Sequence, residues 1–165
     1  CSSKWTVEGD DPTAKRLATA LHGRLGVIYG LGSYQGAVAN RWRGQINENA
    51  KNLASTHVFP ELNHNEILGW IKASEQGVRE YVGIVLRDGT ESEKMQTRER
   101  VTRRLIGDAC VFYDAVAEGN NLLERMVSLT YLGDFVSIYL AALNGVDPES
   151  IDSINVLKEE LSRVP

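Results

Sequence analysis

Cysteine is scarce in this sequence, and its scarcity excludes one large class of fold. The 165 residues contain two cysteines, Cys1 and Cys110, which are too few for a disulfide framework. Cys110 lies within an apolar run, where a thiol usually packs as a small hydrophobic side chain. We therefore expect a protein of a reducing compartment, the cytoplasm. No cationic segment followed by an apolar one is visible, so we expect no signal peptide.

An excess of positive charge and long apolar runs are absent too. Lysine and arginine total 18 against 22 acidic residues, which gives a formal net charge of −4. Because such a surface has no general attraction for a polyanion, nucleic acid is not an expected partner. The longest apolar stretch, 136–143, is well short of the ~20 residues of a membrane span, so no membrane association is expected.

Motifs for metals and for several cofactors are missing. The chain has no Cys/His set with zinc spacing, no H-E-x-x-H, no Walker sequence and no G-x-S-x-G elbow. A glycine-rich turn runs from Gly30 to Gly36, but the dinucleotide pattern G-x-G-x-x-G would need a glycine in place of Gln35. We therefore expect no metal and no organic cofactor.

A regular alternation of strand and helix patterns is present. Short β-branched runs bounded by glycine or proline predict strands, and longer segments with apolar residues three and four apart predict helices. Such alternation implies an α/β fold with a mainly parallel sheet covered by helices on both faces. The predicted strands are 25–30, 56–59, 81–86 and 109–117, and the predicted helices are 13–22, 37–51, 65–76, 91–105, 120–143 and 150–163.

One domain is the expected organisation. With 42% apolar residues, the chain can form a core that removes roughly 70% of its unfolded surface from water. Residues 1–12 are polar and without periodicity, which predicts an arm or linker before a single domain over 13–165. The predicted helix 120–143 is too apolar for a solvated element, so we expect it at the centre of the domain or at a subunit interface.

The turn from Gly30 to Gly36 connects a predicted strand to a predicted helix. Its backbone N–H groups and the helix dipole can attract an anion. A tight strand-to-helix turn explains the same glycines without any ligand. Both interpretations stay open at this point.

Amides and one carboxylate crowd the end of the predicted helix 37–51. Residues 45–51 have the sequence QINENAK, where an ordinary helix would carry more alanine and leucine. The amides could hold the carboxylate of Glu48 in one orientation, as a base that acts on a carbon acid requires. A solvated polar face is the alternative.

A second polar segment, 60–66, follows the predicted strand 56–59 at the edge where open α/β sheets bind ligands. His64 stands between two asparagines that can fix its tautomer, and a histidine can move a proton near neutral pH. An asparagine N-cap beside an exposed histidine is the alternative. His22 and His57 are weaker candidates, because one lies on a polar helix and the other within a strand.

Two segments together resemble a known family. Residues 39–51, ANRWRGQINENAK, followed by residues 60–67, PELNHNEI, closely resemble the bifunctional phosphoglucose/phosphomannose isomerases of bacteria and archaea. The resemblance is to their C-terminal half, a sugar isomerase (SIS) domain, and extends over nearly the whole chain. It implies a three-layer, flavodoxin-like sandwich and interconversion of glucose 6-phosphate, and of mannose 6-phosphate in some members, with fructose 6-phosphate.

The resemblance also implies roles for particular residues. Glu48 matches the base that moves a proton between C1 and C2 of the open-chain sugar. His64 matches a histidine associated with ring opening that reaches the active site of the neighbouring subunit, which implies a homodimer with shared sites. Lys158 matches a lysine placed at the ring oxygen and hydroxyls. Further substrate contacts are expected from Gly32, Ser33, Arg41, Asn47 and Asn63.

Members of that family have two SIS domains in one longer chain. The N-terminal domain supplies the Ser/Thr-rich phosphate loop and an arginine, and nothing in the 165 residues replaces it. The segment 147–150, DPES, also departs from the threonine-containing turn expected of relatives. A noncatalytic SIS module that binds a sugar phosphate or mediates dimerisation is therefore the alternative function. Because a sensor needs no base, the presence of Glu48, His64 and Lys158 together favours the enzyme.

Overall fold

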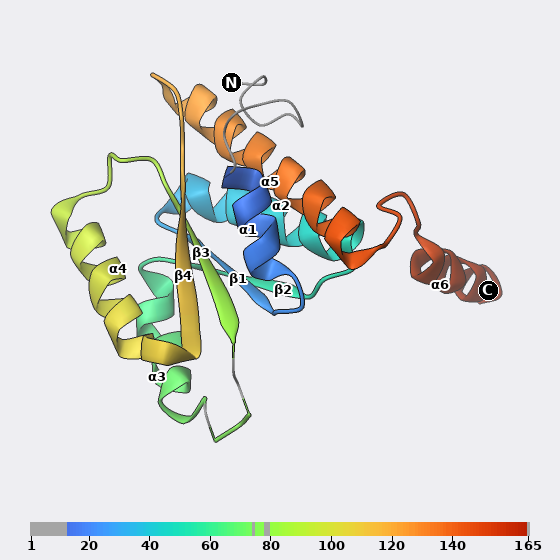
Figure 1. Cartoon of the computed structure of the whole chain (residues 1–165), viewed down its shortest axis with the longest axis horizontal. Helices are drawn as coiled ribbons and strands as arrows, with labels where there is room; N and C mark the ends of the chain where they lie inside the picture. Colours follow the sequence, from blue (N-terminus) through green and yellow to red (C-terminus); the bar gives the residue numbers. More distant parts are fainter. Residues whose placement is uncertain (1–12, 74, 78–79, 165) are drawn as a thin grey trace.

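A parallel sheet of four strands forms the centre of the fold (Figure 1). The computed structural model describes residues 13–73, 75–77 and 80–164, so the predicted arm 1–12 lies outside the described residues. Each neighbouring pair of strands is parallel. The sheet order is β2–β1–β3–β4, with β1 Gly26–Gly30, β2 Ala54–Val58, β3 Tyr81–Arg87 and β4 Cys110–Val116.

Helices cover both faces of this sheet, so the predicted three-layer α/β class is confirmed (Figure 1). Strand β1 is buried along its whole length, because it is a central strand with a helical layer on each side. Its Ile28 faces one core and its Tyr29 the other. The first layer consists of α1 Thr13–Leu21, α2 Ser33–Ala50 and α5 Leu122–Asn144; the second contains α3 Glu66–Gly69 and α4 Glu93–Ile106.

Helices α2 and α5 approach each other closely where Trp42 lies over Gly133. The indole Nε1 of Trp42 donates a hydrogen bond to the carbonyl oxygen of Leu129 at 2.8 Å, and the Trp42 side chain is fully buried. A Cβ atom on residue 133 would lie 2.3 Å from that nitrogen, which is far inside van der Waals contact. Only glycine therefore permits this crossing.

Helix α5 is long and apolar enough to cross a membrane by length and composition alone. The uninterrupted apolar run in the sequence is much shorter than α5, because Glu124, Arg125 and Asp134 lie within the helix. Core helices of soluble proteins pass the same test. Here α5 packs against α1 and α2, and Leu129, Val136 and Leu140 are fully buried at that contact.

The predicted helix 65–76 is wrong as a single element. In its place the chain forms short turns: η2 Glu61–His64, α3 Glu66–Gly69 and η3 Trp70–Lys72. Leu68 and Ile71, which the helical pattern assigns to a core face, are 63% and 72% exposed. Polar contacts described below fix this segment, and a periodicity of apolar residues cannot reveal them.

The last helix, α6 Asp152–Ser162, confirms the helix predicted over 150–163 but extends away from the rest of the domain (Figure 1). It contains no buried residue. The predicted apolar face therefore exists, but no other described part of the chain covers it.

Candidate functional site

The residues predicted to act together lie at two opposite edges of the sheet. Helix α2 begins at the carboxyl edge, where the N–H of Phe59 donates to the carbonyl of Gly30 at 2.9 Å. It ends at the amino edge, where β2 begins. With a rise of 1.5 Å per residue, Ser33 and Glu48 are separated by about 22 Å along α2. One hexose phosphate cannot contact both Ser33 and Glu48 of a single chain.

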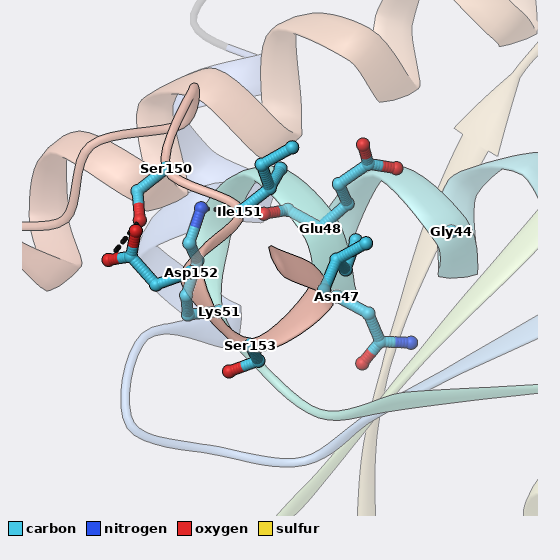
Figure 2. A pocket seen from close by; sticks show the side chains of 9 residues that line it. Gly44, Asn47, Glu48, Lys51, Ser150, Ile151, Asp152 and Ser153 are labelled. Atoms are coloured by element: carbon cyan, nitrogen blue, oxygen red, sulfur yellow. Dashed lines mark hydrogen bonds between the residues drawn. The ribbon is translucent and has the colours of Figure 1, made fainter. Parts of the chain in front are cut away.

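The residues at the amino edge of the sheet, among them Asn47 and Glu48, surround a pocket of about 520 Å³ (Figure 2). One wall comes from the end of α2, with Glu48 and Lys51, and the other from residues 150–154 at the start of α6. Glu48 is exposed, and within residues 13–73, 75–77 and 80–164 no hydrogen bond or ion pair engages its carboxylate. The carboxylate is therefore accessible to a small molecule and able to accept a proton from it.

Lys51 connects the two walls of this pocket. Its Nζ donates to the carbonyl oxygens of Glu48 at 2.8 Å, Asp147 at 2.9 Å and Pro148 at 3.5 Å. Its backbone has the left-handed conformation of a helix C-cap, with φ 50°. The ammonium group thus satisfies carbonyls at the end of α2 and holds the turn that leads into α6. No role was predicted for Lys51 from the sequence, although its place at the end of the NENAK segment was a signal.

Asn47 and Arg41, two of the predicted substrate contacts, have partners inside the chain. The Asn47 amide donates to the carbonyl of Ala54 and accepts from its N–H, at 3.3 and 3.1 Å, so it fixes the start of β2. Arg41 pairs with Asp134 of α5 at 3.0 Å. Both side chains thus help to position α2, and their contact with substrate stays a prediction.

The carboxyl-edge group centres on His64, in the η2 turn that follows β2. His64 is exposed, and no hydrogen bond to its ring is found among the residues that the structure describes. Asn63 donates to the hydroxyl of Thr102 on α4 at 2.8 Å, which attaches this turn to the second helical layer. Asn65 caps α3 by accepting from the N–H of Glu66. Both neighbours of His64 thus have partners inside the chain, and the substrate contact of Asn63 stays a prediction. The ring of His64 is free to face another molecule.

The glycine turn lies at the same edge. Gly36 presses against Val58, where a Cβ atom would lie 2.8 Å from Val58 Cγ2, so close packing of α2 on β2 explains this glycine. The hydroxyl of Tyr34 donates to Asp88, which follows β3. Burial raises the pKa of Asp88, but hydrogen bonds from Tyr34 and Thr90 outweigh this effect and lower it.

The carboxylate of Asp88, which Tyr34 holds in place, therefore lies beside the first turn of α2. Its negative charge opposes the binding of an anion there. The geometry favours the interpretation of the glycines as a tight strand-to-helix turn. Substrate contacts by Gly32 and Ser33 stay predictions, and because both residues lie at the carboxyl edge, they cannot serve the Glu48 pocket of their own chain.

Lys158 lies one helical turn beyond the pocket wall, on α6. It follows Ile154, which lines the pocket, by four residues, or about 6 Å along the helix axis. Its side chain is exposed. Lys158 is not among the residues that line the Glu48 pocket, and its contact with substrate stays a prediction.

Glu66 forms a cluster that was not predicted from the sequence. Its carboxylate accepts from the hydroxyl of Tyr29 at 2.8 Å and from the indole of Trp70 at 3.0 Å, and it contacts His57 Nδ1 at 2.8 Å. Burial raises the pKa of Glu66, but the hydrogen bonds from His57, Trp70 and Tyr29 together lower it below its usual range. This cluster attaches the segment 61–72, and with it His64, to strands β1 and β2.

Cys110 is buried, as predicted for a thiol that packs as a hydrophobic side chain. Burial raises the pKa of the thiol to about 12, so the reactive thiolate is suppressed at neutral pH. No cluster of three or more potential metal-ligating His, Cys, Asp or Glu side chains occurs in the described ranges.

Comparison with known families identifies the domain. The family model of the bacterial phospho-glucose isomerase C-terminal SIS domain matches residues 10–161. The chain belongs to this family. A bifunctional phosphoglucose/phosphomannose isomerase of Caldicellulosiruptor bescii is 42% identical over 153 residues, which are 92% of this chain and 44% of that protein. The protein of the same name from Aquifex aeolicus is 32% identical over 97% of this chain and 49% of its own length.

Solved structures agree on the fold of this SIS domain. A glucose-6-phosphate isomerase like protein from Thermus thermophilus superimposes with a TM-score of 0.66 at 23% sequence identity. The match covers 92% of this chain and 47% of that protein. The SIS domain described here thus spans about half the length of the curated relatives that it matches.

Proposed function

We propose that this SIS domain is the C-terminal half of an aldose–ketose isomerase that interconverts glucose 6-phosphate, and also mannose 6-phosphate, with fructose 6-phosphate. The observation that carries the proposal is the accessible Glu48 carboxylate at the mouth of a 520 Å³ pocket, in a family whose curated relatives are phosphoglucose/phosphomannose isomerases. Such an enzyme would act in the cytoplasm, in glycolysis or gluconeogenesis.

The proposed reaction moves one proton between neighbouring carbon atoms. Glu48 removes the proton from C2 of the open-chain aldose, and the resulting enediolate takes it back at C1 to give the ketose. A proton beside a carbonyl is only weakly acidic, so the base must lie within hydrogen-bond reach of it, and cations or donors must stabilise the enediolate. Lys158 and His64 are the groups proposed to exchange protons with the ring oxygen and hydroxyls.

We further propose that a homodimer completes each site. Glu48 and His64 lie at opposite edges of the sheet in one chain, which supports a site that takes the carboxylate from one subunit and the histidine from its partner. The outward apolar residues of α5, Leu123, Val127 and Tyr131, recur at four-residue spacing and are exposed, as a helix at a subunit interface would require.

Replacement of Glu48 by glutamine tests the function. In the complete polypeptide, Glu48→Gln keeps the shape of the side chain but cannot accept a proton, so kcat for fructose 6-phosphate should fall on the order of 10²-fold or more. KM should change little. Glu93→Gln, which removes an exposed carboxylate at the start of α4, is the matched control and should keep full activity.

The noncatalytic alternative gives a different result in the same assay. A module that only binds a sugar phosphate would show titratable binding of glucose 6-phosphate without turnover in the unaltered polypeptide. Near-normal turnover by the Glu48→Gln variant would contradict the assignment of the base.

A further inference from the structure

Two asparagines flank Glu48 in the sequence, and each is bound to a different element of the fold. Successive residues of an α-helix are turned by about 100°, so Asn47 and Asn49 leave α2 on opposite sides of Glu48. Asn47 binds the backbone of Ala54 at the start of β2. The amide of Asn49 donates to the hydroxyl of Ser137 on α5 at 2.9 Å. The last turn of α2 is therefore held to the sheet on one side and to α5 on the other.

Ser137 is well placed to accept the hydrogen bond from Asn49. Its side chain is fully buried, and its hydroxyl donates to the carbonyl of Asp134, three residues earlier on α5, at 2.7 Å. Because its proton is used in that bond, the oxygen is left to accept from Asn49. Val136 and Leu140, its neighbours on α5, are fully buried apolar side chains. The bond between Asn49 and Ser137 is thus a directional contact within an otherwise apolar packing of two helices.

This polar pair contributes little stability that an apolar pair could not supply. Both groups exchange hydrogen bonds with water for one bond with each other, so replacement of both by apolar groups of similar shape is often nearly neutral. Apolar contacts have no preferred direction, whereas a hydrogen bond weakens when its donor turns away. The bond from Asn49 to Ser137 therefore specifies how α2 is rotated about its own axis.

The rotation of α2 decides where the carboxylate of Glu48 lies. This carboxylate is about 6 Å from the helix axis, so a turn of about 10° would move it by about 1 Å. A displacement of that size can lower the rate of a reaction about 10²-fold. Asn144 also binds the end of α2, through the carbonyl of Ala50 at 2.9 Å. Because helix carbonyls point along the axis, that bond fixes the height of the helix end and not its rotation.

We propose that Asn49 is a positioning residue, which acts through Ser137 to orient the Glu48 carboxylate toward the pocket. The inference rests on the proposed function, because it concerns the base of that reaction. Asn47 and Glu48 line the pocket, whereas Asn49 and Ser137 are not among its lining residues (Figure 2). The amides predicted to orient Glu48 thus act on the helix that carries it, through bonds to β2 and α5.

Replacement of Ser137 in the complete polypeptide tests the proposal. Ser137→Ala removes the acceptor, so kcat for fructose 6-phosphate should fall about 10- to 100-fold, while KM changes less than about twofold. Ser128→Ala is the matched control. Ser128 is also buried on α5, where it donates to the carbonyl of Arg125 and accepts from the N–H of Glu118, which follows β4. Its replacement should weaken the fold to a similar extent but leave kcat unchanged.

A double variant separates orientation from stability. Asn49→Leu combined with Ser137→Ala replaces both partners by apolar groups, so the urea midpoint of unfolding should stay near that of the unaltered polypeptide. The kcat should nevertheless remain low, because the new contact has no direction. Full kcat in this double variant would overturn the proposal. Equal effects of Ser137→Ala and Ser128→Ala on kcat would overturn it as well.

Crystal structures of the same variants give a measurement that needs no turnover. In Ser137→Ala the Glu48 carboxylate should be displaced by about 1 Å relative to β2, whereas Ser128→Ala should leave it in place. An undisplaced carboxylate in Ser137→Ala would overturn the positioning role. Absence of turnover by the unaltered polypeptide would instead contradict the isomerase function, and the displacement would still decide whether Asn49 and Ser137 orient Glu48.

Discussion

Glu48 and His64 lie at opposite edges of the β-sheet, the first near the end of α2 and the second in the turn after β2. Their separation follows from the topology, because every helix that connects two parallel strands runs from the carboxyl edge back to the amino edge. The two side chains can share a substrate only if they come from different chains.

Mixed dimers should therefore regain activity. Subunits of the complete polypeptide with Glu48→Gln are mixed with subunits carrying His64→Ala, and each variant alone is expected to be nearly inactive. After random exchange, roughly a quarter of all sites would combine an intact Glu48 with an intact His64. A coupled isomerase assay measures the recovered fraction. No recovery after demonstrated subunit exchange would contradict shared sites.

Replacement of Lys51 should disturb both walls of the pocket. Lys51→Met removes the hydrogen bonds to Glu48, Asp147 and Pro148 but keeps most of the side-chain volume. We expect the free energy of unfolding to fall by about 1 kcal/mol. In the complete polypeptide, the proposed isomerase activity should fall about tenfold in kcat/KM because the two walls move apart.

Lys51→Arg keeps a cation at this position and should restore part of both losses. Lys72→Met, which breaks an exposed pair with Glu75, is the control. Equal kcat/KM values for the Met and Arg variants of Lys51 would show that the cation does not position the pocket.

The Glu66 cluster should make the fold sensitive to acid. Because the pKa of Glu66 is lowered in the folded state, its ionised form contributes stability that is complete above the usual value of 4.5 and is lost as pH falls. Glu66→Gln should lower the free energy of unfolding at pH 7 by about 1–3 kcal/mol. The difference from the unaltered chain should shrink below pH 4.5. Urea denaturation at several pH values measures it.

An exposed carboxylate gives the comparison for this effect. Glu75→Gln removes only a surface pair with Lys72. It should change the free energy of unfolding by less than about 1 kcal/mol, both at pH 7 and at acidic pH. A Glu66→Gln variant with the same small effect would mean that the cluster does not hold the 61–72 segment.

The 165-residue chain by itself should fold without catalysing isomerisation. Its two buried clusters on opposite faces of the sheet can form independently of any other domain. The proposed site, however, lacks the other half and its positioning of the substrate, so both kcat and affinity should fall. Near-ultraviolet circular dichroism and a coupled assay with fructose 6-phosphate measure the two properties. Substantial turnover by this chain would show that it is a complete enzyme.

Local sequence patterns predicted the strands and the longer helices. Runs such as Val27 to Tyr29 are apolar and β-branched or aromatic, and a buried parallel strand needs such residues on both faces. The beginning of α2 at Ser33, four residues before the predicted 37, was missed because the glycine turn is shorter than its composition suggests.

Contacts between distant residues could not be predicted in this way. The 61–72 segment follows the hydrogen bond of Glu66 with Tyr29, which lies 37 residues earlier in the sequence, instead of its own helical periodicity. For α6, the pattern correctly predicted an apolar face, but a single sequence does not specify what covers it. For the site, the resemblance in residues 39–51 and 60–67 indicated Glu48 and His64 and implied that His64 serves a neighbouring subunit. The structure adds that the two residues lie at opposite edges of the sheet in one chain.

The contact between Trp42 and Gly133 makes the position of Glu48 depend on a residue in another helix. Trp42 packs between the backbones of α2 and α5. Glu48 lies six residues further along α2, about 9 Å from this contact. A side chain at position 133 would clash with Trp42, so α2 would have to tilt away from α5. The carboxylate of Glu48 would move with the helix. Selection on the proposed base would thus also act on Gly133, which does not line the Glu48 pocket.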